Sequence, residues 1–348
     1  MKEITINKKK IGKGNPAFII AEVGQAHEGS LAIAHSFIDA AYDSGADAIK
    51  FQTHIAKAES TLDEKFRKKF PTQDNNRYEY WKRMEFSFSQ WKELKEHSDD
   101  KGIIFLSSPF SLEAFDILNE LNIPAWKIGS GEYNSNLLIQ KMVESNKPVL
   151  LSTGMSYIDE IDEKVKYLND KKCDYAIFQC TSQYPTKPEN VGINFISDFI
   201  NKYNVPIGLS DHTGNIFSSL ASISLGANLI EVHVTFNKKM FGPDASSSIN
   251  FDQFKFLIKG RDEIFKYLNS NKSKNEITNN ISKMRELFTK SLAFNNDMNI
   301  GDIITKDSLV LKKPGTGIPI DKINEVIGKE LIKDVCANRL LNWNDIKL

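Results

Sequence analysis

The sequence predicts an α/β protein: a (β/α)8 TIM barrel over residues 1–269, followed by a small β-rich domain. Short apolar runs alternate with stretches in which apolar residues recur every three or four positions, and this pattern repeats eight times over about 250 residues. Several apolar runs end in groups able to do chemistry. Strands of a parallel barrel have this character where their C-terminal ends open into an active site.

Eight runs are expected as strands: Phe18–Gly24, Ala48–Thr53, Ile103–Pro109, Ala125–Gly131, Pro148–Met155, Tyr175–Ser182, Val205–His212 and Leu229–Phe236. Seven stretches are expected as helices: Ala32–Ser44, Phe88–Lys101, Leu112–Leu121, Ile158–Asn169, Val191–Tyr203, Phe217–Ala227 and Asn250–Leu268. An open doubly wound sheet is the alternative fold, which the absence of a G-x-G-x-x-G motif after the first strand weakens. Residues 1–15 alternate apolar and polar side chains, which predicts a hairpin at the bottom of the barrel.

Two segments interrupt or follow the barrel pattern. The connection Ile55–Phe86 is long, charged and aromatic, which is typical of a lid or a partner surface, although a solvated excursion with one short helix fits as well. Residues 270–285 are polar and are expected as a linker or a solvated helix end. Residues 286–348 are expected as a second domain, too small to bury much core alone. It should therefore lean on its own barrel or on a neighbour's.

Composition argues against several classes of partner. The chain has 348 residues with 45 basic and 45 acidic side chains, so no dominant charge favours nucleic acid or a membrane surface. The three cysteines are few and widely spaced, which argues against a disulfide framework and fits a reducing cytoplasm. No apolar run approaches about 18 residues and the first residues contain no apolar signal core, so we expect no membrane span.

Two lysines, Lys50 and Lys127, lie inside apolar strands, where a buried ammonium is costly without a counter-anion. A single such lysine is explained equally well by a structural ion pair. Two of them, surrounded by hydroxyls at strand ends, favour the binding of a phosphate or carboxylate substrate. The other polar residues at the expected strand ends are Glu22, Gln52, Ser107, Ser108, Ser130, Ser152, Thr153, Ser182 and Ser210.

His212 and His233 end two strands that follow one another in the chain. Neighbouring strands lie about 5 Å apart, so the two imidazoles can grip one divalent cation. Each has an acid nearby, Asp211 or Glu231, suited to orienting or ligating roles. Two imidazole ligands plus oxygens, with some coordination positions of the metal left open, suit Mn²⁺, Co²⁺, Fe²⁺ or Mg²⁺ better than a structural zinc ion. Neutral core histidines are the alternative explanation.

Two further histidines belong near the same strand ends. His27 follows the first strand, where it can contact substrate or simply stabilise its loop. His54 follows Gln52 closely enough to reach the expected pocket.

Motifs along nearly the whole chain, taken in order, resemble the sialic acid (N-acetylneuraminate) synthases, which make nine-carbon nonulosonic acids. These motifs are A-E-V-G-Q-A-H-E-G-S, A-D-A-I-K-F-Q-T-H, F-L-S-S-P-F-S, K-I-G-S-G-E, L-S-T-G-M, Q-C-T-S-Q-Y-P, G-L-S-D-H-T, E-V-H-V-T, G-P-D-A-S-S-S and K-K-P-G-T-G-I. The last of them is similar to the family's C-terminal antifreeze-like (SAF) domain.

The resemblance implies a transferase that condenses phosphoenolpyruvate with an N-acetylated amino sugar such as N-acetylmannosamine and with water, releasing phosphate by C–O cleavage. It implies that phosphoenolpyruvate is held by Lys50, Lys127, Ser130, Ser152, Ser182 and Ser210, with Ser108 nearby. It implies sugar contacts from Glu22, Gln52, Tyr184 and Asp244, with Glu22, Lys50, Lys127 and Asp244 as the catalytic set. It implies a metal on His212 and His233, Mn²⁺ first and Mg²⁺ or Co²⁺ as alternatives. It also implies a domain-swapped homodimer in which one chain's small domain covers its partner's barrel.

The chain departs from the family pattern at three positions. Ala26 stands where the family commonly has asparagine, Ser182 stands where asparagine is frequent, and Lys313 replaces an arginine that contacts the sugar's acyl group. The same chemistry on a 2,4-diacetamido-2,4,6-trideoxyhexose, as in legionaminic or pseudaminic acid synthesis, is therefore the main alternative. A Schiff-base aldolase using Lys50 or Lys127 is a second alternative. A carbohydrate-binding module is a third, but it leaves the polar strand ends unexplained.

Overall fold

The computed structural model describes residues 2–66 and 74–347. The chain divides into two compact units, Met1–Asn269 and Ser270–Leu348. The first unit is built around eight parallel strands: β3 (Phe18–Gly24), β4 (Ala48–Thr53), β5 (Ile104–Pro109), β6 (Trp126–Ile128), β7 (Val149–Ser152), β8 (Tyr175–Cys180), β9 (Ile207–Asp211) and β10 (Leu229–Thr235). A short ninth strand, β11 (Ile249–Asn250), pairs in parallel with the C-terminal end of β10.

The strands are ordered β5-β4-β3-β10-β9-β8-β7-β6, and the two ends of this path, β5 and β6, pack against each other. The sheet therefore closes, which confirms the predicted barrel and excludes the open doubly wound alternative. Each predicted strand is present. Ala125–Gly131 was predicted too long, because the chain leaves β6 after Ile128 and turns in a short 3₁₀ helix at Ser130–Glu132.

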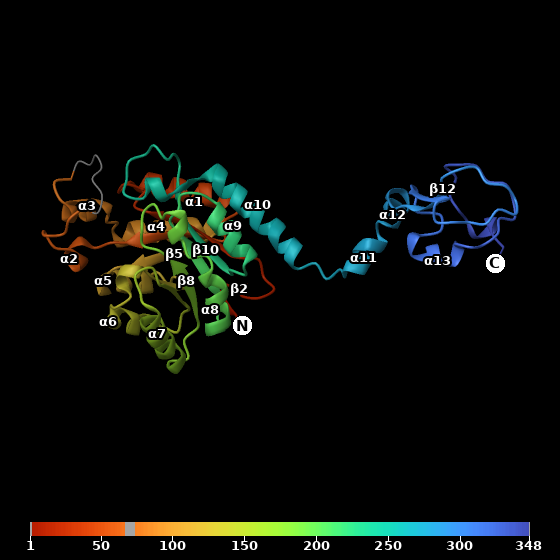
Figure 1. The fold of residues 1–348 in the computed structure, drawn as a ribbon. Coiled ribbons are helices and arrows are strands. Elements are labelled where there is room, and N and C mark those ends of the chain that lie inside the picture. Colours follow the sequence, from red (N-terminus) through yellow and green to blue (C-terminus); the bar gives the residue numbers. More distant parts are fainter. Residues whose placement is uncertain (1, 67–73, 348) are drawn as a thin grey trace. The chain divides into compact units, whose positions relative to one another are not determined.

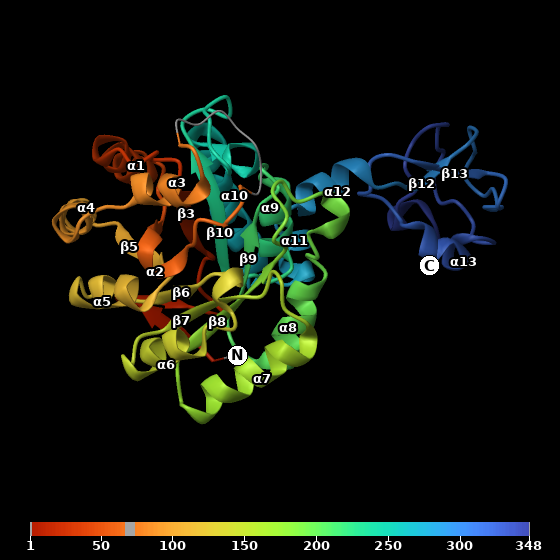
Figure 2. The ribbon, with the colours of Figure 1, turned by 90° about the vertical axis from the view of Figure 1, so that its left-hand side faces the viewer.

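Helices surround the strands, as Figure 2 shows for α4 to α8. They are α1 (Leu31–Asp43), α4 (Phe88–Lys101), α5 (Leu112–Glu120), α6 (Asn136–Glu144), α7 (Ile158–Asp170), α8 (Phe195–Tyr203), α9 (Phe217–Ser224) and α10 (Phe251–Leu268). Local sequence sets their ends: Ser87 and Gln90 form a capping box at the start of α4, and Gly102, with φ of 82°, ends it.

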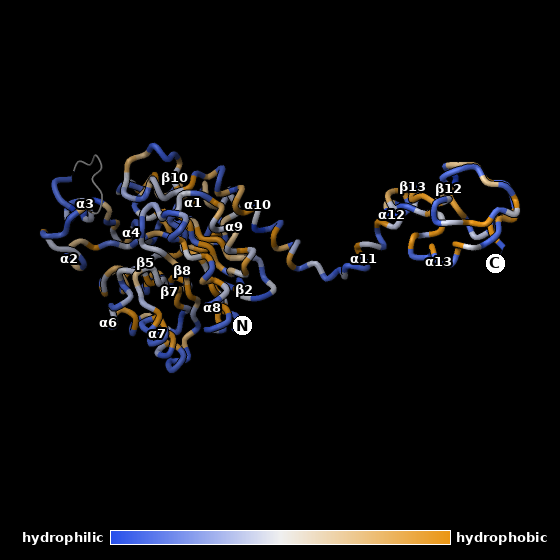
Figure 3. Tube along the Cα trace, viewed as in Figure 1, coloured by the Kyte–Doolittle hydropathy of each residue, from blue (hydrophilic) through white to orange (hydrophobic). Residues whose placement is uncertain are grey.

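Apolar residues gather along strands such as β7 and β8, between the helices (Figure 3).

The sequence analysis missed α6. Its buried residues Leu138, Ile139, Met142 and Val143 do follow a helical spacing. The helix has only nine residues and no side-chain cap at Ser135, so its pattern is short and lacks a start signal.

The N-terminal residues form the predicted hairpin, from strands β1 (Ile4–Ile6) and β2 (Lys9–Ile11). Ile4, Ile6 and Ile11 are fully buried and share a core cluster with residues that begin barrel strands, such as Phe18 and Ala48. The hairpin therefore closes the N-terminal end of the barrel, and the opposite end remains for the site.

The long connection after β4 contains two short helices, α2 (Ala56–Glu59) and α3 (Arg77–Met84), rather than one (Figure 1). Tyr80, Trp81 and Met84 of α3 are buried in a small apolar cluster with Ala56. This segment is therefore a packed element and not a solvated excursion, as far as the described residues show. Residues 67–73 of the predicted lid lie outside the described residues.

The second unit has its own small core. It begins with helices α11 (Lys274–Asn279) and α12 (Ser282–Phe288), which occupy most of the residues expected as a linker. Strands β12 (Ser291–Phe294) and β13 (Leu309–Lys312) pair antiparallel, isolated bridges add further β structure, and helix α13 (Ile323–Val326) packs beside them. This confirms a small β-rich domain.

Two expectations from composition can be compared with the fold. No helix in residues 2–66 and 74–347 is long and apolar enough to cross a membrane. Cys173, Cys180 and Cys336 are all free thiols.

Candidate active site

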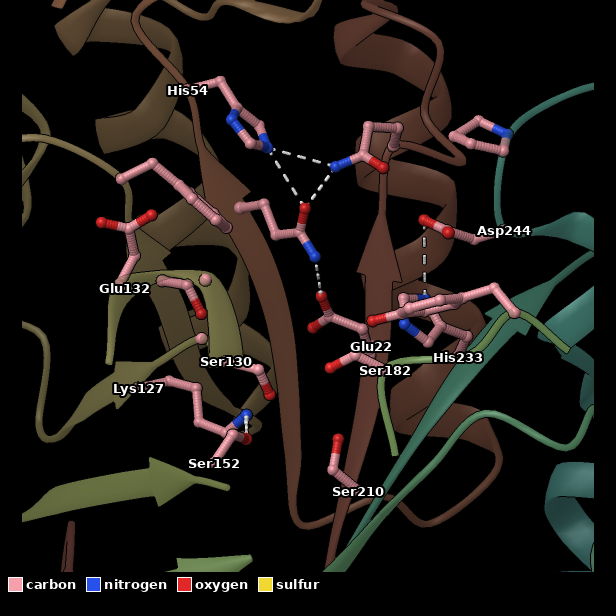
Figure 4. A pocket seen from close by; sticks show the side chains of 18 of the residues that line it. Glu22, His54, Lys127, Ser130, Glu132, Ser152, Ser182, Ser210, His233 and Asp244 are labelled. Carbon is pink, nitrogen blue, oxygen red and sulfur yellow. Dashed lines mark hydrogen bonds and ion pairs between the residues drawn. The ribbon is translucent and has the colours of Figure 1, made fainter. Parts of the chain in front are cut away.

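The C-terminal ends of the barrel strands open into a cavity of about 640 Å³. Of the fourteen site residues that the family resemblance implies, thirteen line it: Glu22, Lys50, Gln52, Ser108, Lys127, Ser130, Ser152, Ser182, Tyr184, Ser210, His212, His233 and Asp244. Figure 4 shows many of these side chains converging from different strands. The exception, Lys313, belongs to the second unit, where it is exposed and its ammonium lies 5.0 Å from the ring centre of Phe288.

The floor of the cavity holds two buried lysines and two buried glutamates. Lys50 Nζ lies 2.7 Å from Glu22 Oε2, and Lys127 Nζ lies 3.0 Å from Glu231 Oε1. Lys50 Nζ is also 3.8 Å from Glu231 Oε2, so the four charges form one cluster. The chain therefore supplies its own counter-anions for both lysines, as in the structural ion pair that was the alternative for a single lysine.

Burial and pairing shift the pKa values in this cluster in opposite directions. Burial raises the pKa of Glu22 to about 7, and the ion pair with Lys50 offsets only part of that effect. Burial would also raise the pKa of Glu231, but Lys127 and Lys50 together lower it to about 2. Burial alone would lower the pKa of Lys50, whereas Glu22 and Glu231 raise it above its ordinary value. Lys50 is therefore an ammonium, and Glu22 is the carboxyl that can exchange a proton near neutral pH.

Hydroxyl groups surround the lysines. Ser152 Oγ accepts a hydrogen bond from Lys127 Nζ at 2.7 Å, and Ser108 Oγ accepts one from Lys50 Nζ at 3.2 Å. Ser210 Oγ donates to Glu231 Oε1 at 3.1 Å. The ammonium groups and hydroxyls together can hold an anion at the cavity floor.

Gly154, which the sequence analysis did not single out, leaves space beside this floor. A Cβ atom at this position would lie 2.5 Å from Ser182 Oγ and 2.6 Å from Ser130 Oγ. Ser130 Oγ already accepts a hydrogen bond from Gly154 N at 3.1 Å. A backbone N–H and two hydroxyls therefore meet where no side chain intrudes.

His212 and His233 lie side by side, with ring centres 5.4 Å apart. His212 Nδ1 is 2.9 Å from the Thr181 carbonyl oxygen and donates to it, which directs Nε2 away from the backbone. Among the described atoms, His233 Nδ1 is buried without a hydrogen-bond partner and lies 4.0 Å from Asp244 Oδ2 (Figure 4). These two nitrogens fit a divalent cation whose other positions are filled by water or substrate.

The two rings differ in their affinity for a proton. Burial lowers the pKa of His233 to about 4, so this ring is neutral, as a metal ligand must be. Burial would also lower the pKa of His212, but Cys180 and the Thr181 carbonyl raise it to about 9. A bound cation would displace that proton. The described residues contain no group of three or more His, Cys, Asp or Glu placed to hold a metal, so the histidines would share the ion with other ligands.

The two acids that neighbour the histidines in sequence, Asp211 and Glu231, are hydrogen-bonded or ion-paired to other residues and not to the histidine rings. Asp211 accepts hydrogen bonds from Ser218 and Ser219 and so anchors the start of α9. Glu231 pairs with the lysines instead. The predicted orienting or ligating role at the metal is therefore wrong for Asp211, whereas Glu231 lines the same cavity as the histidines but is paired with the lysines.

The two remaining histidines have different roles. His27 Nδ1 accepts a hydrogen bond from Gly29 N at 3.1 Å and its ring packs on Phe86, so the loop-structure alternative is correct. His54 does line the cavity, as expected from its distance to Gln52.

Further lining residues come from the segment after β4 and from other loops: Gln25, Glu59, Glu64, Phe66, Arg77, Trp81, Phe110 and Glu132. Sequence reasoning identified the segment by its length but not these side chains. The only available signal was its unusual content of aromatic and charged residues.

Known proteins are similar to this chain in both sequence and fold. The NeuB family model matches residues 37–273, and the SAF domain model matches residues 289–347. The chain is 34% identical to the N,N'-diacetyllegionaminic acid synthase of Campylobacter jejuni, covering 93% of this chain and 98% of that one. It is 31% identical to the N-acetylneuraminate-9-phosphate synthase of Homo sapiens, covering 93% and 91% of the two chains.

A solved structure agrees with these sequence matches. The N-acetylneuraminic acid (sialic acid) synthetase of Leptospira borgpetersenii, in complex with citrate, superposes with a TM-score of 0.71 at 30% identity, covering 82% of this chain and 98% of that one. The chain therefore belongs to the NeuB family, as an enzyme of the sialic acid synthase type with a C-terminal SAF domain.

Proposed function

We propose that the chain condenses phosphoenolpyruvate with an N-acetylated amino sugar such as N-acetylmannosamine and with water, forming a nonulosonic acid and phosphate. The observation that carries this proposal is the buried cluster of Lys50, Lys127, Glu22 and Glu231 beneath a pair of histidines. Such a floor suits a small substrate that carries both a carboxylate and a phosphate.

Lys50 and Lys127 hold phosphoenolpyruvate, with Ser130, Ser152, Ser182 and Ser210 as donors around it and Ser108 beside Lys50. An ammonium supplies charge from a single point, whereas hydroxyls orient the bound oxygens. The substrate anion competes with Glu22 and Glu231 for the lysines. The internal carboxylates thus keep the Lys50 ammonium charged until the substrate arrives.

His212 and His233 would hold a divalent metal ion, Mn²⁺ in first place and Mg²⁺ or Co²⁺ as alternatives. Metal dependence is general among the synthases of this family. When bound, the ion supplies a Lewis acid for the sugar's aldehyde oxygen. Tyr184, stacked on His212 with ring centres 4.1 Å apart, fixes the ring, and Asp244 lies beside His233. Tyr184, Asp244 and Gln52 contact the sugar.

Glu22 performs the proton chemistry. C3 of phosphoenolpyruvate attacks the aldehyde carbon, which leaves cationic character at C2, and a carboxylate nearby stabilises that charge. Glu22 then takes a proton from the water that adds to C2. The C2–O bond to phosphate breaks, and phosphate leaves with the bridging oxygen.

Release of inorganic phosphate from phosphoenolpyruvate tests the proposal. We expect release that requires an N-acetylated amino sugar, measured across N-acetylmannosamine and diacetamido-trideoxyhexoses with Mn²⁺ present. A Schiff-base aldolase would instead use pyruvate without metal and would be trapped by borohydride. The ion pairs that keep Lys50 charged disfavour that alternative, because imine formation requires a neutral amine.

The rate should depend on pH through Glu22. Its pKa of about 7 means that the carboxylate needed to activate water is lost as pH falls below that value. We expect kcat/KM for phosphoenolpyruvate, which reports ionisations of the free enzyme, to decline about tenfold per pH unit on the acid side of roughly pH 7. A profile that stays flat from pH 5.5 to 8, with the metal kept saturating, would contradict this role.

Substitution of Lys313 tests the identity of the sugar. By the family resemblance, Lys313 stands where an arginine contacts the sugar's acyl group. Arginine offers two donors in a planar fork, whereas lysine offers one mobile ammonium. We expect the native chain to prefer a 6-deoxy diacetamido sugar and Lys313→Arg to shift kcat/KM toward N-acetylmannosamine by about tenfold. If both forms use N-acetylmannosamine equally well, Lys313 merely replaces the arginine.

We further propose that the enzyme is a domain-swapped homodimer, in which the small domain of one chain completes the site of its partner. Lys127→Met and Lys313→Ala are then defects in different parts of the same composite site. Mixing the two impaired variants should raise activity above that of either variant alone, up to about a quarter of the native value, because some exchanged dimers contain one intact site. No recovery after confirmed subunit exchange would count against the swap.

A further inference from the structure

His54 is held between two aromatic rings at the wall of the cavity. Its ring centre lies 4.0 Å from that of Trp81 and 4.3 Å from that of Phe110, and the planes are within 22° of parallel. Only 4% of the residue is exposed. Turning the imidazole over would sweep it through its neighbours, so the positions of its two nitrogens are fixed.

Both nitrogens have partners. Nδ1 lies 2.6 Å from Glu59 Oε1, and Nε2 lies 3.1 Å from Gln52 Oε1 and 3.1 Å from Gln25 Nε2. Gln25 Nε2 also donates to Gln52 Oε1, and Gln52 Nε2 donates to Glu22 Oε1 at 2.7 Å. A chain of hydrogen bonds thus runs from Glu59 through His54 to Glu22, as the dashed lines between His54 and Glu22 show in Figure 4.

This chain fixes the orientation of the Gln52 amide in either protonation state of the imidazole. A carboxylate at Glu59 requires a proton on Nδ1. If Nε2 also carries a proton, His54 and Gln25 both donate to Gln52 Oε1. If Nε2 is bare, it accepts from Gln25, which still donates to Gln52 Oε1. In both cases the oxygen of Gln52 faces its donors, and its N–H groups are left for Glu22.

Two of the groups that hold His54, Glu59 and Trp81, come from the long segment after β4, whereas Phe110 follows β5. Glu59 is the last residue of α2, and Trp81 lies in α3, where its Nε1 donates to Glu64 at 3.0 Å. The same segment lines the cavity. Its packing therefore determines where His54 stands.

We propose that His54 is a positioning residue that transmits the packing of α2 and α3, through the locked amide of Gln52, to the carboxylate of Glu22. The inference rests on the proposed function for the role of Glu22. In this role His54 acts through Gln52 and not on the reacting atoms themselves. It aims an N–H of Gln52 at one carboxylate oxygen of Glu22, and so directs the other oxygen toward Lys50 and the reacting carbon.

A double-mutant cycle between His54→Phe and Gln52→Ala tests the inference. Phenylalanine keeps the aromatic sandwich and removes both ring nitrogens. We expect His54→Phe to lower kcat about 30-fold while the KM for phosphoenolpyruvate changes less than about twofold. In the Gln52→Ala background the same substitution should change kcat less than about twofold, because the residue through which it acts is gone. His54→Gln, whose amide can donate to Gln52, should have a kcat about tenfold higher than that of His54→Phe.

A crystal structure of His54→Phe supplies a readout that does not depend on turnover. We expect the Gln52 amide to leave hydrogen-bond distance of Glu22 while α2 and α3 stay in place. Native kcat in His54→Phe, equal losses in both backgrounds, or an unmoved Gln52 would each overturn the inference. An inactive native enzyme would instead refute the proposed function, and the Gln52 position would still decide the inference.

Discussion

Replacing either His212 or His233 by alanine should lower kcat about a thousandfold or more, because each change removes one of two imidazole ligands of the proposed Lewis acid. Exhaustive chelation of the native enzyme should have the same effect, with Mn²⁺ or Co²⁺ restoring the rate. Phosphate release measures both results. Calorimetric titration with Mn²⁺ should show binding in the native chain and none in the doubly substituted one.

His35 provides a matched control for these substitutions. It lies on α1, where its nitrogens contact His97 and Glu93, and it is not among the residues that line the cavity. His35→Ala should therefore leave both turnover and Mn²⁺ binding unchanged. Full activity in excess chelator would show that the two histidines serve the site in some other way.

Replacing Lys127 by methionine should strongly weaken the binding of phosphoenolpyruvate. The change removes a charge-assisted contact of about 1.5–3 kcal/mol, so the KM for phosphoenolpyruvate should rise between about 10-fold and 150-fold. It also leaves Glu231 facing only the more distant Lys50 ammonium, 3.8 Å away, in a buried position. We therefore expect a lower midpoint of thermal unfolding as well.

Lys141→Met is the matched control, because Lys141 forms an exposed ion pair with Asp116 on the outer helices. It should change neither the KM nor the unfolding midpoint appreciably. Adding Glu231→Gln to Lys127→Met should recover stability but not activity, which separates the two effects. If Lys127→Met raised only the KM for the sugar, its assignment to phosphoenolpyruvate would be wrong.

The strand ends could be predicted from the sequence because a barrel strand reads as an uninterrupted apolar run with polar groups at its C-terminal end. The wrong prediction that Asp211 orients or ligates the metal could have been avoided from the sequence. Side chains alternate across a strand, so with Ser210 and His212 facing the cavity, Asp211 must face outward, where the serines of α9 meet it.

Glu231 illustrates what alternation alone does not reveal. It shares a face with His233 but lies two residues, about 7 Å, deeper in the barrel. Side chains inside such a barrel stack in layers contributed by different strands. Its true neighbours are Lys127 and Lys50 from strands far away in sequence, and only the closed fold brings them into one layer.

The wall formed by α2 and α3 could not be predicted residue by residue. Its packing depends on irregular contacts, such as His54 between Trp81 and Phe110, that follow no sequence period. Length and aromatic content fitted a lid or partner surface as well as a solvated excursion, and the partner of each side chain is set by tertiary structure.

The fate of the oxygen that bridges C2 and phosphorus in phosphoenolpyruvate tests the central claim most directly. Phosphoenolpyruvate labelled with ¹⁸O at that position should be turned over with the accepted amino sugar, and both products analysed by mass spectrometry. Attack through C3 followed by addition of water at C2 predicts that the label leaves entirely with inorganic phosphate. Label retained at C2 of the nonulosonic acid would mean that the P–O bond breaks instead, and would contradict the mechanism assigned to Glu22 and the two lysines.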